Sequence, residues 1–202
     1  MGNEDAWRFT SFHGILETQL QMESWNLLRD LHQCFSLPLL CVGDFNEIAK
    51  THEKQGGRLW PYARMKIFRD ALDECGLIDL GFVGSKFTWF KNFANGVSVW
   101  ERLDRAVGST DWFALFPTTK VVPIDYVTFD HKPIMIFPSG VPMKSKKPWR
   151  LKLLMVPLWI RWWKNWWSVR INSSGGVGSL LIILLKHWPR RKSFWKRLKT
   201  WL

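Results

Sequence analysis

The stretch that decides the fold is Leu39-Leu40-Cys41-Val42-Gly43-Asp44-Phe45-Asn46-Glu47. Its first half has the composition of a buried strand, and it ends abruptly in Gly-Asp-x-Asn. Asp44 and Asn46 are two residues apart, so their side chains point the same way where the strand ends. A carboxylate binds a metal ion or a water, and a carboxamide donates to a phosphate oxygen. The stretch predicts a site at a strand end, although Gly-Asp taken alone is also typical of a simple turn.

Outward from this strand, the pattern alternates between strands and helices. Apolar residues at helical spacing predict two helices, and Gly76 is placed to end the second of them. A turn signal at residues 92–96 predicts a hairpin. The expected strands are 7–12, 39–42, 87–90, 97–101 and 121–127, and the expected helices are 21–35 and 65–75. Strands mixed with two peripheral helices predict an α/β layered sandwich.

Two later segments carry further polar residues suited to chemistry. Arg102-Leu103-Asp104-Arg105 follows an aromatic strand, and Asp130-His131-Lys132-Pro133-Ile134 begins 26 residues after Asp104. Taken singly, Asp104 is typical of a helix start, Asp130 of a strand-end turn and His131 of a half-buried polar residue. Together they offer carboxylates and an imidazole, which hydrolysis of a phosphodiester requires to activate water and to stabilise charge at phosphorus.

In this order, the three segments resemble the endonuclease/exonuclease/phosphatase (DNase I-like) superfamily. Within it they are most similar to the apurinic-type endonuclease domain of plant LINE-type (non-LTR) retrotransposons. The resemblance covers roughly residues 7–137 and is also carried by Ser24-Trp25-Asn26-Leu27-Leu28-Arg29, Glu53-Lys54-Gln55-Gly56-Gly57, Phe68-Arg69-Asp70-Ala71-Leu72, Cys75-Gly76-Leu77-Ile78-Asp79-Leu80-Gly81-Phe82 and Phe87-Thr88-Trp89. It implies that residues 1–137 are the C-terminal half of a four-layer α/β/β/α sandwich. Pro and Gly residues at 138–148 interrupt the pattern and predict a linker, which is followed by a tail at 149–202.

The resemblance also implies roles for the polar residues. Asp44 would orient and deprotonate the attacking water, and Asn46 would hold a phosphate oxygen. His131 would contact the phosphate, with Asp104 fixing its ring. Asp130 would bind Mg²⁺ together with Asp44, because Mg²⁺ prefers oxygen ligands.

His13 has two interpretations. It stands in Phe12-His13-Gly14, where the retrotransposon endonucleases that the chain resembles usually have Tyr. Deoxyribonucleases of the same superfamily have His there, and it can protonate the leaving group. The substitution therefore either preserves a proton donor or is drift in a dead copy.

The resemblance also predicts a deficiency. In the family, an Asn and a metal-binding Glu lie on strands that precede the Trp7 region, and residues 1–14 hold no Glu in a comparable strand-end context. The expectation is a truncated endonuclease domain that is inactive alone, with an underligated metal. The alternative is a non-catalytic remnant that associates weakly with nucleic acid or a membrane surface. A phosphoinositide or small-phosphoester hydrolase is disfavoured by Glu53-Lys54-Gln55-Gly56-Gly57 and Phe87-Thr88-Trp89.

Charge divides the chain sharply. The formal net charge is +12, yet the last 66 residues hold 15 Lys and Arg and no Asp or Glu, while the first 136 hold 14 basic and 17 acidic residues. Nine of the 15 Trp also lie in the tail. A basic aromatic helix at 158–169 would suit nucleic acid or a membrane surface. The alternative is the remnant of a mutated or frame-shifted element, with an irregular or weakly helical tail.

The remaining expectations concern partners and compartment. DNA is the expected ancestral substrate, with no small-molecule cofactor and no membrane insertion, and the oligomeric state is left open. The three cysteines, Cys34, Cys41 and Cys75, fit neither a disulfide framework nor a zinc site. With no secretory signal at the start, the chain is expected to be intracellular, in the nucleus or cytoplasm.

Overall fold

The first of two larger sheets carries three of the candidate residues, His13, Asp44 and Asp104. A computed structural model describes residues 7–33, 36–124, 130–138, 167–172 and 181–186. The first sheet has the order β1-β2-β7-β4, with bounds β1 (Arg8–His13), β2 (Leu39–Asp44), β7 (Asp104–Ser109) and β4 (Leu77–Asp79). β1 and β2 are parallel, as expected for strands joined through a helix, and the other pairs are antiparallel.

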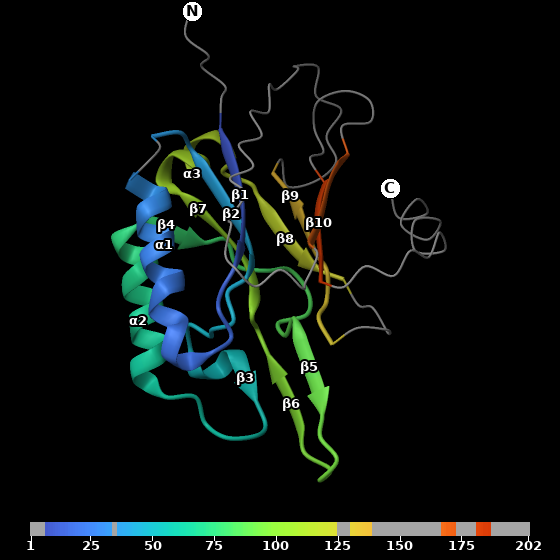
Figure 1. Ribbon diagram of the computed structural model, residues 1–202. Coiled ribbons are helices and arrows are strands. Elements are labelled where there is room, and N and C mark those ends of the chain that lie inside the picture. The colour runs from blue at the N-terminus through green and yellow to red at the C-terminus, as the bar shows by residue number, and fades with distance from the viewer. Residues whose placement is uncertain (1–6, 34–35, 125–129, 139–166, 173–180, 187–202) are drawn as a thin grey trace, which may run out of the picture.

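The second sheet packs against one face of the first (Figure 1). Its order is β10-β11-β9-β8, with bounds β8 (Lys120–Pro123), β9 (Ile134–Phe137), β10 (Trp167–Asn172) and β11 (Leu181–Lys186), and every pair in it is antiparallel. A small third sheet has the order β3-β6-β5, with bounds β3 (Lys54–Gln55), β5 (Trp89–Asn92) and β6 (Ser98–Glu101). Its β5–β6 hairpin projects away from the two larger sheets (Figure 1).

Helices cover the other face of the first sheet. α1 (Gln21–Gln33) and α2 (Tyr62–Glu74) lie side by side there (Figure 1). The shorter helices are η1 (Thr18–Leu20), η2 (Thr51–Glu53) and α3 (Thr110–Leu115). The described residues thus form three layers in the order helices, first sheet, second sheet.

Alternation along the central strand β2 creates two cores. Leu39 and Cys41 face the helices, where Trp25 and Phe68 stack with ring centroids 4.8 Å apart. Leu40 and Val42 face the second sheet in a separate apolar cluster. Because both faces of β2 are covered, its sequence reads as a continuous apolar run rather than as an alternating one.

The α/β layered fold predicted from the sequence is confirmed. The strands at 7–12 and 39–42, the helix at 21–35 and the hairpin are all present within a few residues of their predicted limits. The second helix begins three residues earlier than predicted, at Tyr62, and Gly76 follows its end with φ +58°. The last predicted strand, 121–127, is observed only as β8, and residues 125–129 lie outside the described residues.

The tail differs from the prediction. An irregular or helical tail is wrong for 167–172 and 181–186, which are strands β10 and β11. The helix predicted at 158–169 is therefore wrong from Trp167 onward, while 158–166 lie outside the described residues, as does the predicted linker beyond Pro138. β11 pairs with β9, with Ile182 opposite Ile136, so this part of the tail belongs to the second sheet. Nowhere in the described ranges is there a helix long and apolar enough to cross a membrane.

Candidate active site

The candidate residues lie in a row across one end of the first sheet. The strand register places His13 beside Asp44 and Asp44 beside Asp104. This follows from the topology, because β1 and β2 end where the antiparallel β7 begins. Gly43 allows β1 and β2 to approach closely, since a Cβ there would lie 1.7 Å from the carbonyl oxygen of Phe12.

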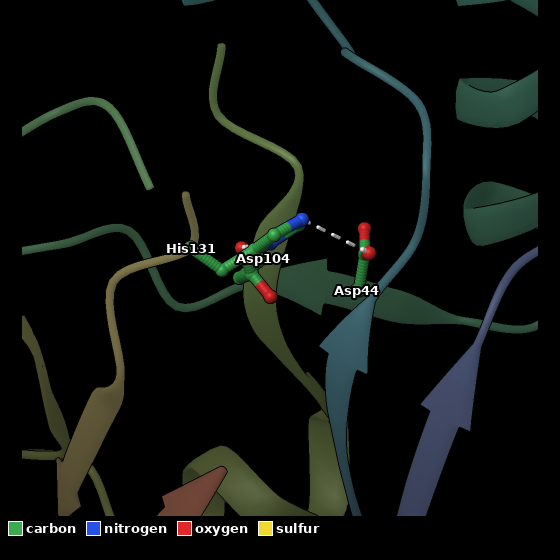
Figure 2. Close-up of side chains that lie close together, drawn as sticks. All are labelled: Asp44, Asp104 and His131. Carbon is green, nitrogen blue, oxygen red and sulfur yellow. Dashed lines mark hydrogen bonds and ion pairs between the residues drawn. The ribbon is translucent and has the colours of Figure 1, made fainter. Parts of the chain in front are cut away.

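His131 reaches this row from the segment that precedes β9. Its position is fixed by a bridge to Trp89 of β5 and by a hydrogen bond from Lys132 N to Thr88 O (2.6 Å). The imidazole Nδ1 lies 2.8 Å from Asp104 Oδ2, and Nε2 lies 3.8 Å from Asp44 Oδ2 (Figure 2). One imidazole therefore contacts a carboxylate through each of its ring nitrogens.

The group is closed off from solvent. Asp44 is fully buried, and Asp104 and His131 are 4% and 7% exposed. Burial raises the pKa of the Asp104 carboxyl; the His131 imidazole opposes this increase, and the Asp44 carboxylate adds to it. Two carboxylates around one imidazole leave the site with an excess of negative charge whenever both are ionised. The arrangement therefore favours an additional positive charge, either imidazolium or a bound cation.

Asn46 shapes the loop after β2. It is the single non-glycine residue with a positive φ (51°) among those described. Its backbone N donates to Asp44 Oδ1 (2.9 Å), and its side-chain amide donates to Gly14 O (2.6 Å). Gln21 in turn donates to the Asn46 carbonyl (3.0 Å). These bonds fix the orientation of the Asp44 carboxylate and tie the ends of β1 and β2 together.

The other two predicted site residues lie at the margin of this group. His13 is partly exposed, and its Nδ1 lies 3.9 Å from Asp44 Oδ2, so Asp44 lies between two imidazoles. Asp130 is exposed and accepts from the indole of Trp89 (3.4 Å). The structure thus brings Asp44, Asn46, Asp104, His131 and His13 together and directs Asp130 toward Trp89.

The donor set fits a divalent cation. One ligand atom each from Asp44, Asp104 and His131 all lie within 4.8 Å of one another. Two carboxylates and an imidazole suit Mg²⁺ or Mn²⁺ through the oxygens, and a softer ion through the ring nitrogen. This group shares Asp44 with the predicted pair of metal ligands, Asp44 and Asp130, and adds Asp104 and His131 to it.

Sequence reasoning assigned no role to several residues that shape the site. Thr88 Oγ1 accepts from the backbone N of Leu103 (3.0 Å) and of Asp104 (2.9 Å), which fixes the start of β7. A mostly buried charged cluster formed by Glu53, Asp79, Arg102 and Arg105 lies behind the same strand. Thr88, Glu53 and Asp79 lie inside the segments on which the family resemblance rests. A Thr or a charged residue within an otherwise apolar segment was the sequence signal by which they could have been found.

Comparisons with known proteins give matches among solved structures. The family models give no match, and neither do the curated proteins. Among solved structures, the chain is similar to the endonuclease domain of TRAS1, a telomere-specific non-LTR retrotransposon, with a TM-score of 0.46 and 20% sequence identity. The match covers 62% of this chain and 53% of the TRAS1 chain, so it extends over about half of that domain.

Proposed function

We propose that the chain carries the catalytic residues of a metal-dependent phosphodiester hydrolase, a DNA endonuclease derived from a LINE-type retrotransposon of plant type. The observation that supports it is the buried His131 imidazole between Asp104 and Asp44. The sequence segments around these residues favour DNA as the substrate and an endonuclease as the ancestor.

Each residue has a defined task in this proposal. Asp44 orients the attacking water and accepts its proton, because its Oδ1 is held by Asn46 N while Oδ2 faces both imidazoles. His131 stabilises the negative charge of the phosphate, and Asp104 holds its ring through Nδ1. Asn46 donates to a phosphate oxygen with the second hydrogen of its amide.

A partly exposed His13 suits protonation of the leaving oxygen. Its side chain is 37% exposed, so a substrate can reach it, and its contact with Asp44 orients the ring. Asp44, Asp104 and His131 would hold a divalent cation, which would neutralise charge on the phosphate and acidify a bound water. Asp130, beside His131, remains a predicted further ligand for that cation.

Low activity of the isolated chain, in place of the complete inactivity expected from the sequence, is part of this proposal. The residues present supply two carboxylates and one imidazole in the group, and the resemblance expects one more metal-binding Glu. The alternative function is non-catalytic, with weak association of nucleic acid through the basic tail. It is favoured by the concentration of 15 basic residues in the last 66.

Nicking of supercoiled plasmid by the purified chain tests the proposal. We expect weak nicking that requires Mg²⁺, disappears in Asp44→Ala and persists in Asp30→Ala. Asp30 is a matched control because it is an exposed carboxylate on α1. Nicking that survives in Asp44→Ala, or that needs no metal, would contradict the proposed site. Complete absence of nicking would favour the non-catalytic alternative.

A further inference from the structure

Four charged side chains lie on the far side of β7 from the candidate site, and three of them are buried while the fourth, Asp79, is 28% exposed. They are Glu53, Asp79, Arg102 and Arg105, here called the charged clamp. Successive side chains of a strand point to opposite faces, so Asp104 and Arg105 face opposite ways. In agreement, the Arg105 guanidinium lies over the ring of Phe68 of α2 (5.1 Å), whereas Asp104 meets His131. The charged clamp therefore touches the backbone of the site rather than its side chains.

Arg105 joins three segments through one guanidinium. Its Nη2 donates to Glu47 O (3.2 Å), to Arg102 O (2.9 Å) and to Glu53 Oε2 (2.9 Å). Glu47 follows the Asp44–Asn46 turn directly, and Arg102 immediately precedes the Leu103–Asp104 pair. A single side chain thus bonds both backbone segments that present the two carboxylates of the site.

Glu53 completes the link from the other side. Its Oε2 accepts from Ala49 N (2.6 Å), which continues the same loop after β2. Its Oε1 accepts from Arg102 Nη1 (2.8 Å), and the backbone O of Glu53 accepts from Arg102 N (2.9 Å). Asp79 binds both guanidinium groups, at 2.7 Å and 2.8 Å from Arg102 and 2.9 Å from Arg105, and anchors them to β4.

The positive and negative charges of the clamp balance, so its effect on the site is geometric rather than electrostatic. Two carboxylates face two guanidinium groups, so the cluster adds little net field at the site. A buried ion cluster also contributes little net stability compared with an apolar core of the same volume. Instead, the clamp fixes the relative orientation of the backbone segments, because bidentate Arg–carboxylate bonds constrain the angles as well as the distances between them.

We propose that Glu53 and Arg105 are positioning residues that set the spacing of Asp44 and Asp104 around His131. The inference rests on the proposed function for its catalytic consequence. The spacing itself is measurable without catalysis, since an ionised Asp104 accepts from Nδ1 of His131 and so selects the ring form that carries a proton there.

The test compares Glu53→Gln with Glu101→Gln by ¹H–¹⁵N NMR of the His131 ring at fixed neutral pH. Glu101 is a matched control, because it is as buried as Glu53 and pairs with Lys54 outside the clamp. We expect a downfield, slowly exchanging Nδ1–H proton signal in the wild type and in Glu101→Gln, because this proton lies in the hydrogen bond to Asp104 whether or not Nε2 is also protonated. In Glu53→Gln this signal should move upfield or be lost through exchange with water.

Arg105→Lys provides a second variant, since it keeps the charge but loses the fork that reaches Glu47 O and Arg102 O. It should show the same upfield shift or loss of the Nδ1–H proton signal. Wild-type ring signals in a folded Glu53→Gln protein would overturn the proposal. So would loss of the fold in both variants, because the clamp would then support the whole fold rather than the site. Failure of wild-type nicking would instead count against the proposed function and leave the NMR comparison intact.

Discussion

At the scale of single residues, the surroundings of each carboxylate decide its charge. Asp104 is buried, faces Asp44, and has a raised pKa. Asp79 is only partly buried, and the charges and hydrogen bonds of Arg102 and Arg105 outweigh its burial and lower its pKa to about 2. Burial alone therefore does not predict the ionisation of these residues, whereas the nearest partner does.

Acid sensitivity is the prediction that belongs to this scale. The pKa of Asp79 falls from 3.8 to about 2 in the folded chain. A depressed pKa gives stability that is present above pH 4 and is lost as the pH falls through the folded pKa. The full contribution is about 2 kcal/mol. Most of it should disappear between pH 5 and about pH 2.5, as measured by urea unfolding.

Asp79→Asn isolates this contribution from that of the other carboxylates. The variant should be less stable than the wild type at pH 5, and the difference should shrink toward pH 2.5. A difference that stays constant over this range would mean that Asp79 is not ionised through its contacts with Arg102 and Arg105.

At the scale of elements, the sequence predicted the helices and strands that a pattern of neighbouring residues defines. The helical spacing of Trp25, Leu28 and Leu31 and the apolar run before Asp44 each define an element without help from distant residues. The convergence of Asp44, Asp104 and His131, with His131 within hydrogen-bond distance of Asp104, was also predicted and is confirmed. It was predictable because all three residues stand where strands begin or end.

The features that sequence did not predict depend on distant partners. The charged clamp joins residues 53, 79, 102 and 105 across three elements, so no short window contains its pattern. The tail strand β11 depends on β9 in the same way, since it pairs with a strand about 45 residues earlier. The direction of Asp130 toward Trp89 likewise follows from the hairpin and not from the Asp-His dipeptide.

The close contact of β1 and β2 gives a prediction at this scale. In Gly43→Ala the new Cβ would lie 1.7 Å from the Phe12 carbonyl oxygen, so the two strands must separate. We expect a loss of at least about 2 kcal/mol in the free energy of unfolding. Gly76→Ala is the control, because its Cβ meets nothing within 4 Å and a positive φ alone costs about 1 kcal/mol. Equal losses in the two variants would show that β1 and β2 are not in close contact at Gly43.

At the scale of the whole molecule, the chain joins an acidic body, residues 1–136, to a basic C-terminal part that contains the tail. The tail reaches the body through β11, which pairs with β9. The irregular or weakly helical tail expected from the sequence could be deleted without loss of stability, whereas a strand of the second sheet cannot. Deletion of 145–202 should lower the free energy of unfolding, because β9 would lose one of its two neighbouring strands.

Charge asymmetry predicts how the chain binds DNA in the absence of metal. Binding should weaken steeply between 50 and 200 mM salt, because Lys and Arg displace counterions from phosphates. Replacing Arg190, Arg191 and Lys192 by Ala should reduce the slope of the logarithm of the binding constant against the logarithm of the salt concentration by about 2 to 3. The matched control replaces three exposed basic residues of the body, Arg58, Lys66 and Lys91. A larger change in the control, measured by fluorescence anisotropy, would place the DNA-binding charge on the body.

Asp44, Asp104 and His131 are proposed to form one metal-dependent site. Mn²⁺ binding, followed by electron paramagnetic resonance of the free ion, measures the metal affinity of this site without any need for catalysis. We expect one Mn²⁺ per wild-type chain, affinity at least about tenfold weaker in Asp44→Asn, and unchanged affinity in the surface control Asp30→Asn. Equal affinity of Asp44→Asn and the wild type would contradict the proposed site.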